Sequence, residues 1–232
     1  MRTDWFVAMG MAALLGGTAS ADITCDSQSD SASVQGFVAA NGFGFDSYND
    51  TLSGSTLLAP VSYNLSNTRT VGPNSVWSTA RANINATTFG TQGLLVQGST
   101  RCTSDNVYAA DGNTTANGSQ NYQLWFTVDA PTLATLSVNI IGANGADGSI
   151  GLLSNPVSFG WNAGVGLHVV SMTIGPGSYG LNCNTGTMFS ASGPEFHFIG
   201  EAEWTFELGQ VPAPSSTAAL AVGLIGASRR RR

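Results

Sequence analysis

A strict alternation of side-chain types runs from Glu195 to Leu208. Its even positions are apolar or small, as at Trp204 and Phe206, whereas its odd positions are almost all polar, as at Glu203. Successive side chains of a strand point to opposite faces of a sheet. The pattern therefore predicts a long antiparallel strand with one buried face.

The same two-residue period recurs at 122–128, 134–140 and 168–174, and further apolar clusters lie between residues 37 and 96. No segment between Asp22 and Gln210 has a convincing helical period of about 3.6 residues. Many short strands separated by turn-forming residues are typical of sandwiches and jelly rolls. We expect residues 22–210 to form one all-β domain, an antiparallel β-sandwich or jelly-roll-like body. The polar, glycine-rich segments 111–120 and 142–151 are predicted to be long surface loops.

Positive charge is scarce in this body. The 232 residues include eight basic side chains, all arginine, against 14 acidic ones, for a net charge of −6. Five of the arginines lie in the terminal segments, which leaves Arg69, Arg81 and Arg101 in the body. A negatively charged body repels phosphate backbones, which excludes nucleic acid as a partner.

The first 21 residues have the three parts of a secretory signal peptide. Arg2 precedes an apolar run from Trp5 to Leu15, and the small residues Ala19 and Ala21 occupy the −3 and −1 positions of a cleavage site. The run is shorter than the roughly 20 residues that a membrane-spanning helix needs. We expect residues 1–21 to form a signal helix that is removed on export, so that the mature chain starts at Asp22.

Residues 211–232 also have three parts. Val211, Pro212, Ala213 and Pro214 form an extended Pro-x-Pro stop, residues 217–228 are apolar, and Arg229, Arg230, Arg231 and Arg232 end the sequence. This order resembles the PEP-CTERM sorting signal of bacterial proteins associated with exopolysaccharide, with Ala213 in place of the usual glutamate. The resemblance implies recognition by an exosortase-type processing enzyme and delivery to the cell surface or extracellular matrix. It covers residues 211–232 alone and says nothing about the body.

The apolar part of this tail is short for a permanent anchor. Its twelve residues would reach about 18 Å as a helix, against a hydrocarbon core of about 30 Å. Positive charge stays cytoplasmic, so the arginine cluster would lie inside and the body outside. We expect a short apolar transmembrane helix that holds the chain in the membrane transiently.

The body contains three cysteines, and an exported protein favours disulfides. An odd number leaves one thiol unpaired. We expect a disulfide between Cys102 and Cys183, with Cys25 to Cys102 as an open alternative. Their wide spacing fits no zinc motif.

The sequence contains weak candidates for catalysis. The alternation places His168 on an apolar face and His197 on a polar one, and no Gly-x-Ser-x-Gly motif is present. Glu201, Glu203 and Glu207 share one face, with neighbours about 6.8 Å apart. That spacing approaches the separation of glycosidase carboxylates, but it is also typical of a solvated strand face. We expect no catalytic residues and no enzymatic activity.

Two segments resemble parts of calcium sites. Asp111, Asn113 and Thr115 begin like an EF-hand loop, but Ala116 and Tyr122 replace its essential glycine and glutamate. The segment Gly142 to Ile150 resembles a single calcium-binding nonapeptide repeat. We therefore expect no metal site and no cofactor, with structural Ca²⁺ from loop oxygens left open.

Tryptophans suggest a binding function. Trp125 is predicted to point outward from its strand, and Trp77 and Trp161 lie in polar or glycine-rich surroundings. Exposed aromatic rings beside amides can stack on sugar rings. The leading hypothesis is an exported, non-catalytic structural or adhesive protein of an exopolysaccharide layer. The alternatives are a lectin-like carbohydrate-binding module and, third, a glycan hydrolase that uses the carboxylate face.

Overall fold

The computed structural model describes residues 21–153, 155–191 and 195–210. Sheet A contains, in spatial order, β2 (Gly44–Gly54), β1 (Ile23–Ala40), β6 (Gly112–Val128), β11 (Gly177–Ala191), β8 (Ala146–Leu152) and β9 (Ser158–Gly160). Sheet B contains β10 (Gly166–Ile174), β7 (Thr132–Asn144), β12 (His197–Gln210), β5 (Leu94–Val107), β4 (Asn74–Thr88) and β3 (Val61–Val71). A short 3-10 helix, η1 (Trp161–Ala163), follows β9. The predicted signal peptide and sorting tail, with their helices, lie outside the described residues.

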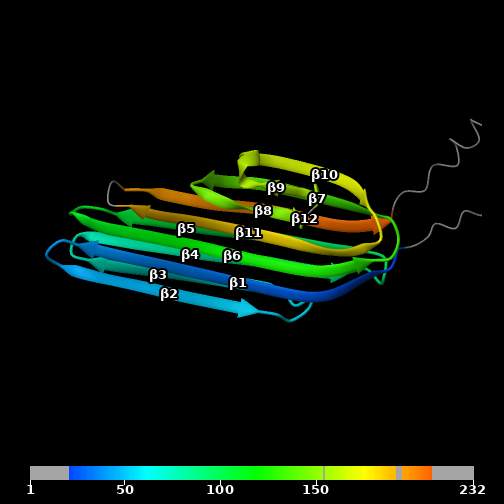
Figure 1. The fold of residues 1–232 in the computed structure, drawn as a ribbon, viewed down its shortest axis with the longest axis horizontal. Helices are drawn as coiled ribbons and strands as arrows, with labels where there is room; N and C mark the ends of the chain where they lie inside the picture. The colour runs from blue at the N-terminus through cyan, green and yellow to red at the C-terminus, as the bar shows by residue number, and fades with distance from the viewer. Residues whose placement is uncertain (1–20, 154, 192–194, 211–232) are drawn as a thin grey trace, which may run out of the picture. The chain divides into compact units, whose positions relative to one another are not determined.

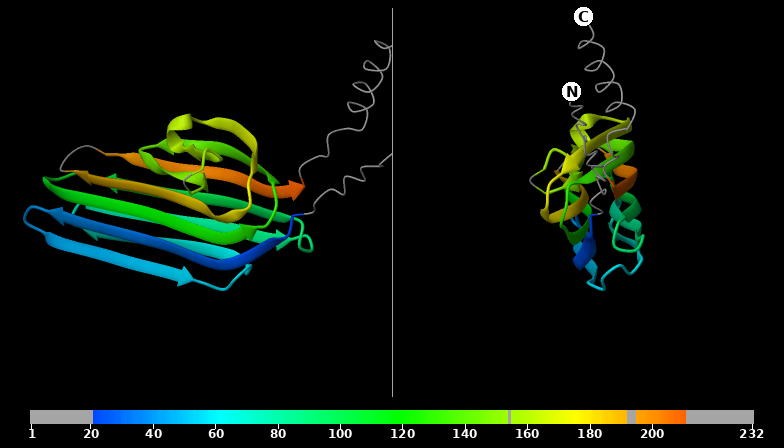
Figure 2. Two further views of the ribbon diagram at one scale, coloured as in Figure 1. Left: turned by 45° about the vertical axis from the view of Figure 1, so that its right-hand side comes forward. Right: turned by 90° about the vertical axis from the view of Figure 1, so that its right-hand side faces the viewer.

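Every neighbouring pair of strands in the two sheets is antiparallel. The strands run side by side along one direction (Figure 1), and the two sheets stack face to face (Figure 2). This arrangement confirms the predicted all-β sandwich. Within the described part of the chain, no helix is long and apolar enough to cross a membrane.

The alternation in the last strand has the predicted consequence. In β12, Ala202, Trp204 and Phe206 are buried, whereas Glu203 and Glu207 are exposed. An antiparallel strand with one face in the core and one in solvent produces this pattern. The even residues of β12 therefore form part of the core, and the odd ones form part of the outer face of sheet B.

Aromatic side chains join the two sheets in the larger part of the core. The ring of Phe126 in sheet A lies 5.9 Å from that of Phe206 in sheet B. Tyr122 and Trp204 make a similar contact across the sandwich, with ring centroids 6.3 Å apart. Such tilted pairs contribute about 0.5–1.5 kcal/mol each beyond the burial of their area.

Part of the space between the sheets is polar. Here side chains of β5 contact side chains of β11 and β6 through buried hydrogen bonds: Thr100 with Thr185 at 3.2 Å, Ser104 with Thr187 at 2.8 Å, and Asn106 with Thr114 at 3.0 Å. Each such bond contributes about 1 kcal/mol net, and loss of one partner would leave a buried polar group unsatisfied. This polar layer therefore constrains how the sheets pair.

The sheets approach closely beside this layer. Gly118 of β6 faces the interior, and a Cβ atom placed on it would collide with the carbonyl oxygen of Thr79. The same Cβ would lie 3.1 Å from the carbonyl oxygen of Thr103. Glycine is thus required here by the contact between two backbones.

The prediction that residues 111–120 and 142–151 form surface loops is wrong. Residues 112–128 form β6, a central strand of sheet A, and residues 142–151 form the end of β7 in sheet B and most of β8 in sheet A, with a turn at Gly145 between them. The polar composition of both segments suggested loops. In β6, however, buried Thr114 accepts a hydrogen bond from Asn106 across the sandwich, and buried Gln120 accepts one from Cys183 of the neighbouring strand β11, so a polar strand can be central.

Candidate functional site

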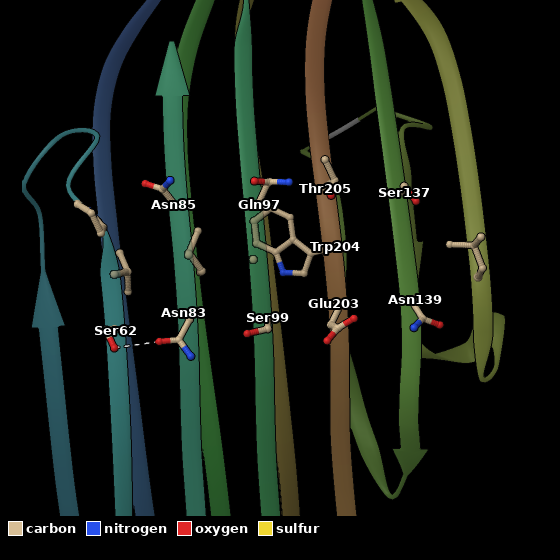
Figure 3. A pocket seen from close by; sticks show the side chains of 15 residues that line it. Ser62, Asn83, Asn85, Gln97, Ser99, Ser137, Asn139, Glu203, Trp204 and Thr205 are labelled. Carbon is tan, nitrogen blue, oxygen red and sulfur yellow. Dashed lines mark hydrogen bonds between the residues drawn. The ribbon is translucent and has the colours of Figure 1, made fainter.

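A hollow of about 660 Å³ lies on the outer face of sheet B. Six strands contribute to it, and Figure 3 shows most of its lining side chains. The outward-pointing residues that line it are Ser62, Asn83, Asn85, Gln97, Ser99, Ser137, Asn139, Leu167, Glu203 and Thr205. Nearly all carry neutral amide or hydroxyl groups.

Strand register aligns these groups in rows. Asn139, Glu203, Ser99, Asn83 and Ser62 are successive cross-strand partners on β7, β12, β5, β4 and β3. Because neighbouring strands lie about 4.8 Å apart, this row presents a hydrogen-bonding group at each such interval.

A second row runs parallel to the first. It contains Ser137, Thr205, Gln97 and Asn85, again as successive partners. The two rows are separated by two residues along each strand, or about 6.8 Å. Together they form a lattice of polar groups across the hollow (Figure 3).

Most of these amides are available to a ligand. Ser62 donates a hydrogen bond of 2.9 Å to Oδ1 of Asn83. Among the described residues, the side-chain amides of Asn85, Gln97 and Asn139 have no hydrogen-bond partner in the protein. A polar ligand can therefore bind them without displacing an internal contact.

The floor of the hollow is closely packed. The indole of Trp204 is only 3% exposed and packs against Gly98, where a Cβ atom would lie 2.5 Å from the ring. Trp204 thus belongs to the core and does not offer a stacking surface.

Charges beside the hollow balance one another. A smaller hollow of about 240 Å³ adjoins it and is lined by Arg81, Arg101, Glu201 and Glu203. Arg81 and Arg101 are direct cross-strand partners, and Nε of Arg101 lies 3.7 Å from a carboxylate oxygen of Glu201. Two positive and two negative groups leave no net charge, so the combined surface favours an uncharged polar ligand.

The three tryptophans of the glycan hypothesis do not come together. Trp125 is 39% exposed on the outer face of sheet A, as predicted from its alternation. Trp77 is half-buried on the outer face of sheet B, opposite Asp105 and away from the hollow. Trp161 is only 5% exposed and packs in the core, which corrects its prediction as a surface contact. Its glycine-rich neighbours place it in η1, which turns the indole inward.

Each histidine lies on its predicted face. His168 points inward, where Nε2 contacts the carbonyl oxygen of Gly164 at 2.8 Å and its ring lies 5.5 Å from that of Phe159. His197 points outward, and its Nδ1 is hydrogen-bonded to the buried carboxylate of Asp105. The two rings lie in different surroundings and form no common site.

The three glutamates of β12 all face outward, but they have different environments. Glu203 lies in the hollow, Glu201 pairs with Arg101, and Glu207 lies beyond the hollow. Glu203 is thus the one carboxylate among the described residues that line the 660 Å³ hollow.

The cysteines are free thiols in this structure, so the predicted disulfide between Cys102 and Cys183 is not formed here. Both are buried between the sheets, one from β5 and one from β11. Cys102 donates to the carbonyl oxygen of Thr185 at 3.4 Å, and Cys183 to Oε1 of Gln120 at 3.7 Å. Their pairing, and the alternative with half-buried Cys25, stay predictions.

The segments considered for calcium lie mostly on strands. Asn113 and Thr115 are outward-facing residues of β6 next to exposed Asp111, and residues 146–150 belong to β8. Among the described residues, no cluster of three or more His, Cys, Asp or Glu side chains is suited to a metal ion.

Sequence reasoning missed the hollow. The outward residues Asn83 and Asn85 alternate with buried Ala82 and Ile84, which is a readable signal for an exposed polar face. Which strands lie beside β4 depends on non-local pairing, and the rows appear only once that pairing is known.

The fold places the chain in the class of two-layer antiparallel β-sandwiches. No protein-family model matches the sequence, and no curated protein matches it.

Proposed function

We propose that this chain is an exported, non-catalytic adhesive protein that binds an extended, uncharged polysaccharide along the outer face of sheet B. The observation that carries the proposal is the pair of amide and hydroxyl rows across the 660 Å³ hollow. Sugar hydroxyls both donate and accept hydrogen bonds, and amide side chains offer both kinds of partner. An open hollow that crosses six strands suits a chain better than a single small molecule.

The terminal sequences support the cellular part of this proposal. A signal peptide at residues 1–21 would direct export, and the PEP-CTERM-like tail at 211–232 would be the substrate of an exosortase-type enzyme. The short apolar helix of the tail would hold the body outside the membrane until sorting. The body would then act at the cell surface or in an exopolysaccharide matrix.

The experiment is affinity electrophoresis of the mature protein in gels that contain xylan, galactomannan, dextran or alginate. We expect retardation by at least one of the three neutral polysaccharides, with little dependence on salt because the ligand is uncharged and the charges of the two adjoining hollows balance. The double substitution Asn83→Ala, Gln97→Ala should weaken that binding about tenfold or more, since each lost hydrogen bond contributes about 0.5–1.5 kcal/mol.

Asn113→Ala is the matched control, because Asn113 is an exposed asparagine on the outer face of sheet A. Its affinity should equal that of the wild type. Absence of retardation in all four gels would refute the proposal. Release of oligosaccharides that is abolished by Glu203→Gln would replace it with the hydrolase hypothesis.

A further inference from the structure

Trp125 forms a flat platform on the outer face of sheet A. Its cross-strand partner on β11 is Gly180, where a Cβ atom would lie 3.2 Å from Cζ2 and Cη2 of the indole. The ring therefore lies over the backbone of Gly180. Leu153 borders the same point, since its Cδ1 atom would lie 3.0 Å from that Cβ, and its side chain is 39% exposed. The indole thus rests against the backbone of Gly180, and the side chain of Trp125 is 39% exposed to solvent.

Polar groups lie on both sides of this platform. On one side, Nε2 of Gln123 donates a hydrogen bond of 3.3 Å to Oδ1 of Asn182. On the other side, the hydroxyl of Thr127 contacts a carboxylate oxygen of Asp26 and the hydroxyl of Ser178, both at 2.9 Å. Each of these two sets lies two residues along the strands from the pair Trp125 and Gly180, or about 6.8 Å away.

This arrangement has the chemistry that recognises a pyranose ring. The C–H face of a sugar ring is apolar and stacks on an aromatic ring, while its equatorial hydroxyls point sideways and require hydrogen-bond partners. The Trp125 platform offers an apolar centre with amides on one side and hydroxyls and a carboxylate on the other.

The platform and the hollow lie back to back. Tyr122 and Phe126, on either side of Trp125 along β6, contact Trp204 and Phe206 of β12 across the core. The odd residues of that same stretch of β12, Glu203 and Thr205, line the hollow. The two surfaces therefore face opposite directions from one rigid sandwich.

We propose that Trp125 is the centre of a second saccharide-binding site, and that the protein cross-links polysaccharide chains by holding one on each face. The inference rests on the proposed function of the hollow. Because the sites point away from each other, one extended chain cannot occupy both on the same molecule. Occupation of both sites therefore joins two polysaccharide chains. Many such cross-links in a gel raise the overall avidity above the affinity of each single site.

The test compares binding with cross-linking in the same four polysaccharides. Affinity electrophoresis reports binding, and light scattering from a dilute polysaccharide solution reports cross-linking as the protein is added. Trp125→Ala should retain binding through the hollow with roughly a two- to tenfold loss of affinity, and it should abolish the rise in scattering. Trp125→Phe, which retains an aromatic platform, should recover much of the scattering.

Two further variants complete the design. The double substitution Asn83→Ala, Gln97→Ala should also bind without cross-linking, now through Trp125. Phe45→Ala is the matched control, because Phe45 is an aromatic side chain of sheet A, 75% exposed, that lies in β2 away from the platform. It should behave as the wild type does.

The outcomes separate the two proposals. A wild type that binds none of the polysaccharides overturns the function of the hollow and, with it, this inference. Normal scattering with Trp125→Ala overturns the second site alone. Complete loss of binding in the Asn83, Gln97 double variant also overturns it, because the platform should still bind. An equal loss of scattering with Phe45→Ala would attribute the effect to general apolar adhesion.

Discussion

Substitution of Gly118 by alanine tests how closely the sheets approach. The new Cβ atom would collide with the carbonyl oxygen of Thr79 and lie 3.1 Å from that of Thr103. Both obstacles are backbone atoms, so relief requires local separation of β6 from β4 and β5. Overpacking of this kind costs about 1–3 kcal/mol. Separation would also stretch the nearby hydrogen bond between Ser104 and Thr187, the loss of which costs about 1 kcal/mol.

The expected total is about 2–4 kcal/mol. In a domain of this size 1 kcal/mol lowers Tm by about 2–4 °C, so a fall of about 5–15 °C should appear in scanning calorimetry. Gly186→Ala is the matched control, since Gly186 faces outward on the adjacent strand and its nearest atoms would lie at 3.8 Å. The control should change stability by no more than about 0.5 kcal/mol. A Tm for Gly118→Ala within experimental error of the Gly186→Ala value would refute the close approach of the sheets.

Two other predictions concern groups that titrate at alkaline pH. Burial raises the pKa of Cys25, Cys102 and Cys183, the last to about 12, so native thiol labelling should be slow and should reach half-buried Cys25 first. Labelling in denaturant without reductant then tests the predicted pairing: one thiol per chain would demonstrate the disulfide, and three would refute it. Burial also raises the pKa of Tyr48 and Tyr122, so both phenols stay neutral in the fold while the unfolded chain ionises near 10.0. The free energy of unfolding should therefore keep its full value below pH 10.0 and fall as the pH rises above it. Equal urea midpoints at pH 8 and pH 11 would contradict this.

The sequence was most informative where a strand has one buried and one exposed face. The alternation in β12 and around His168 predicted the correct faces, because every second side chain there is either in the core or in solvent. It failed in β6. There Thr114 and Gln120 are buried beside polar partners, so their composition resembled that of a loop.

The candidate site was harder to predict than the fold. The outward position of Trp125 follows from local alternation, whereas the burial of Trp161 depends on how η1 packs against the core. The row from Asn139 to Ser62 joins segments that are far apart in sequence. Only the pairing of β7, β12, β5, β4 and β3 brings them into line, and no local pattern specifies that order.

The polar layer between the sheets has a thermodynamic consequence. Exposure of apolar surface on unfolding raises the heat capacity, whereas exposure of polar surface lowers it. The buried hydroxyl and amide groups around Thr100, Ser104 and Thr187 should therefore make the heat-capacity change of unfolding smaller than that of an all-apolar interior of equal size. A smaller change flattens the dependence of stability on temperature. Such a sandwich should lose less of its stability on cooling than one held together by apolar side chains alone.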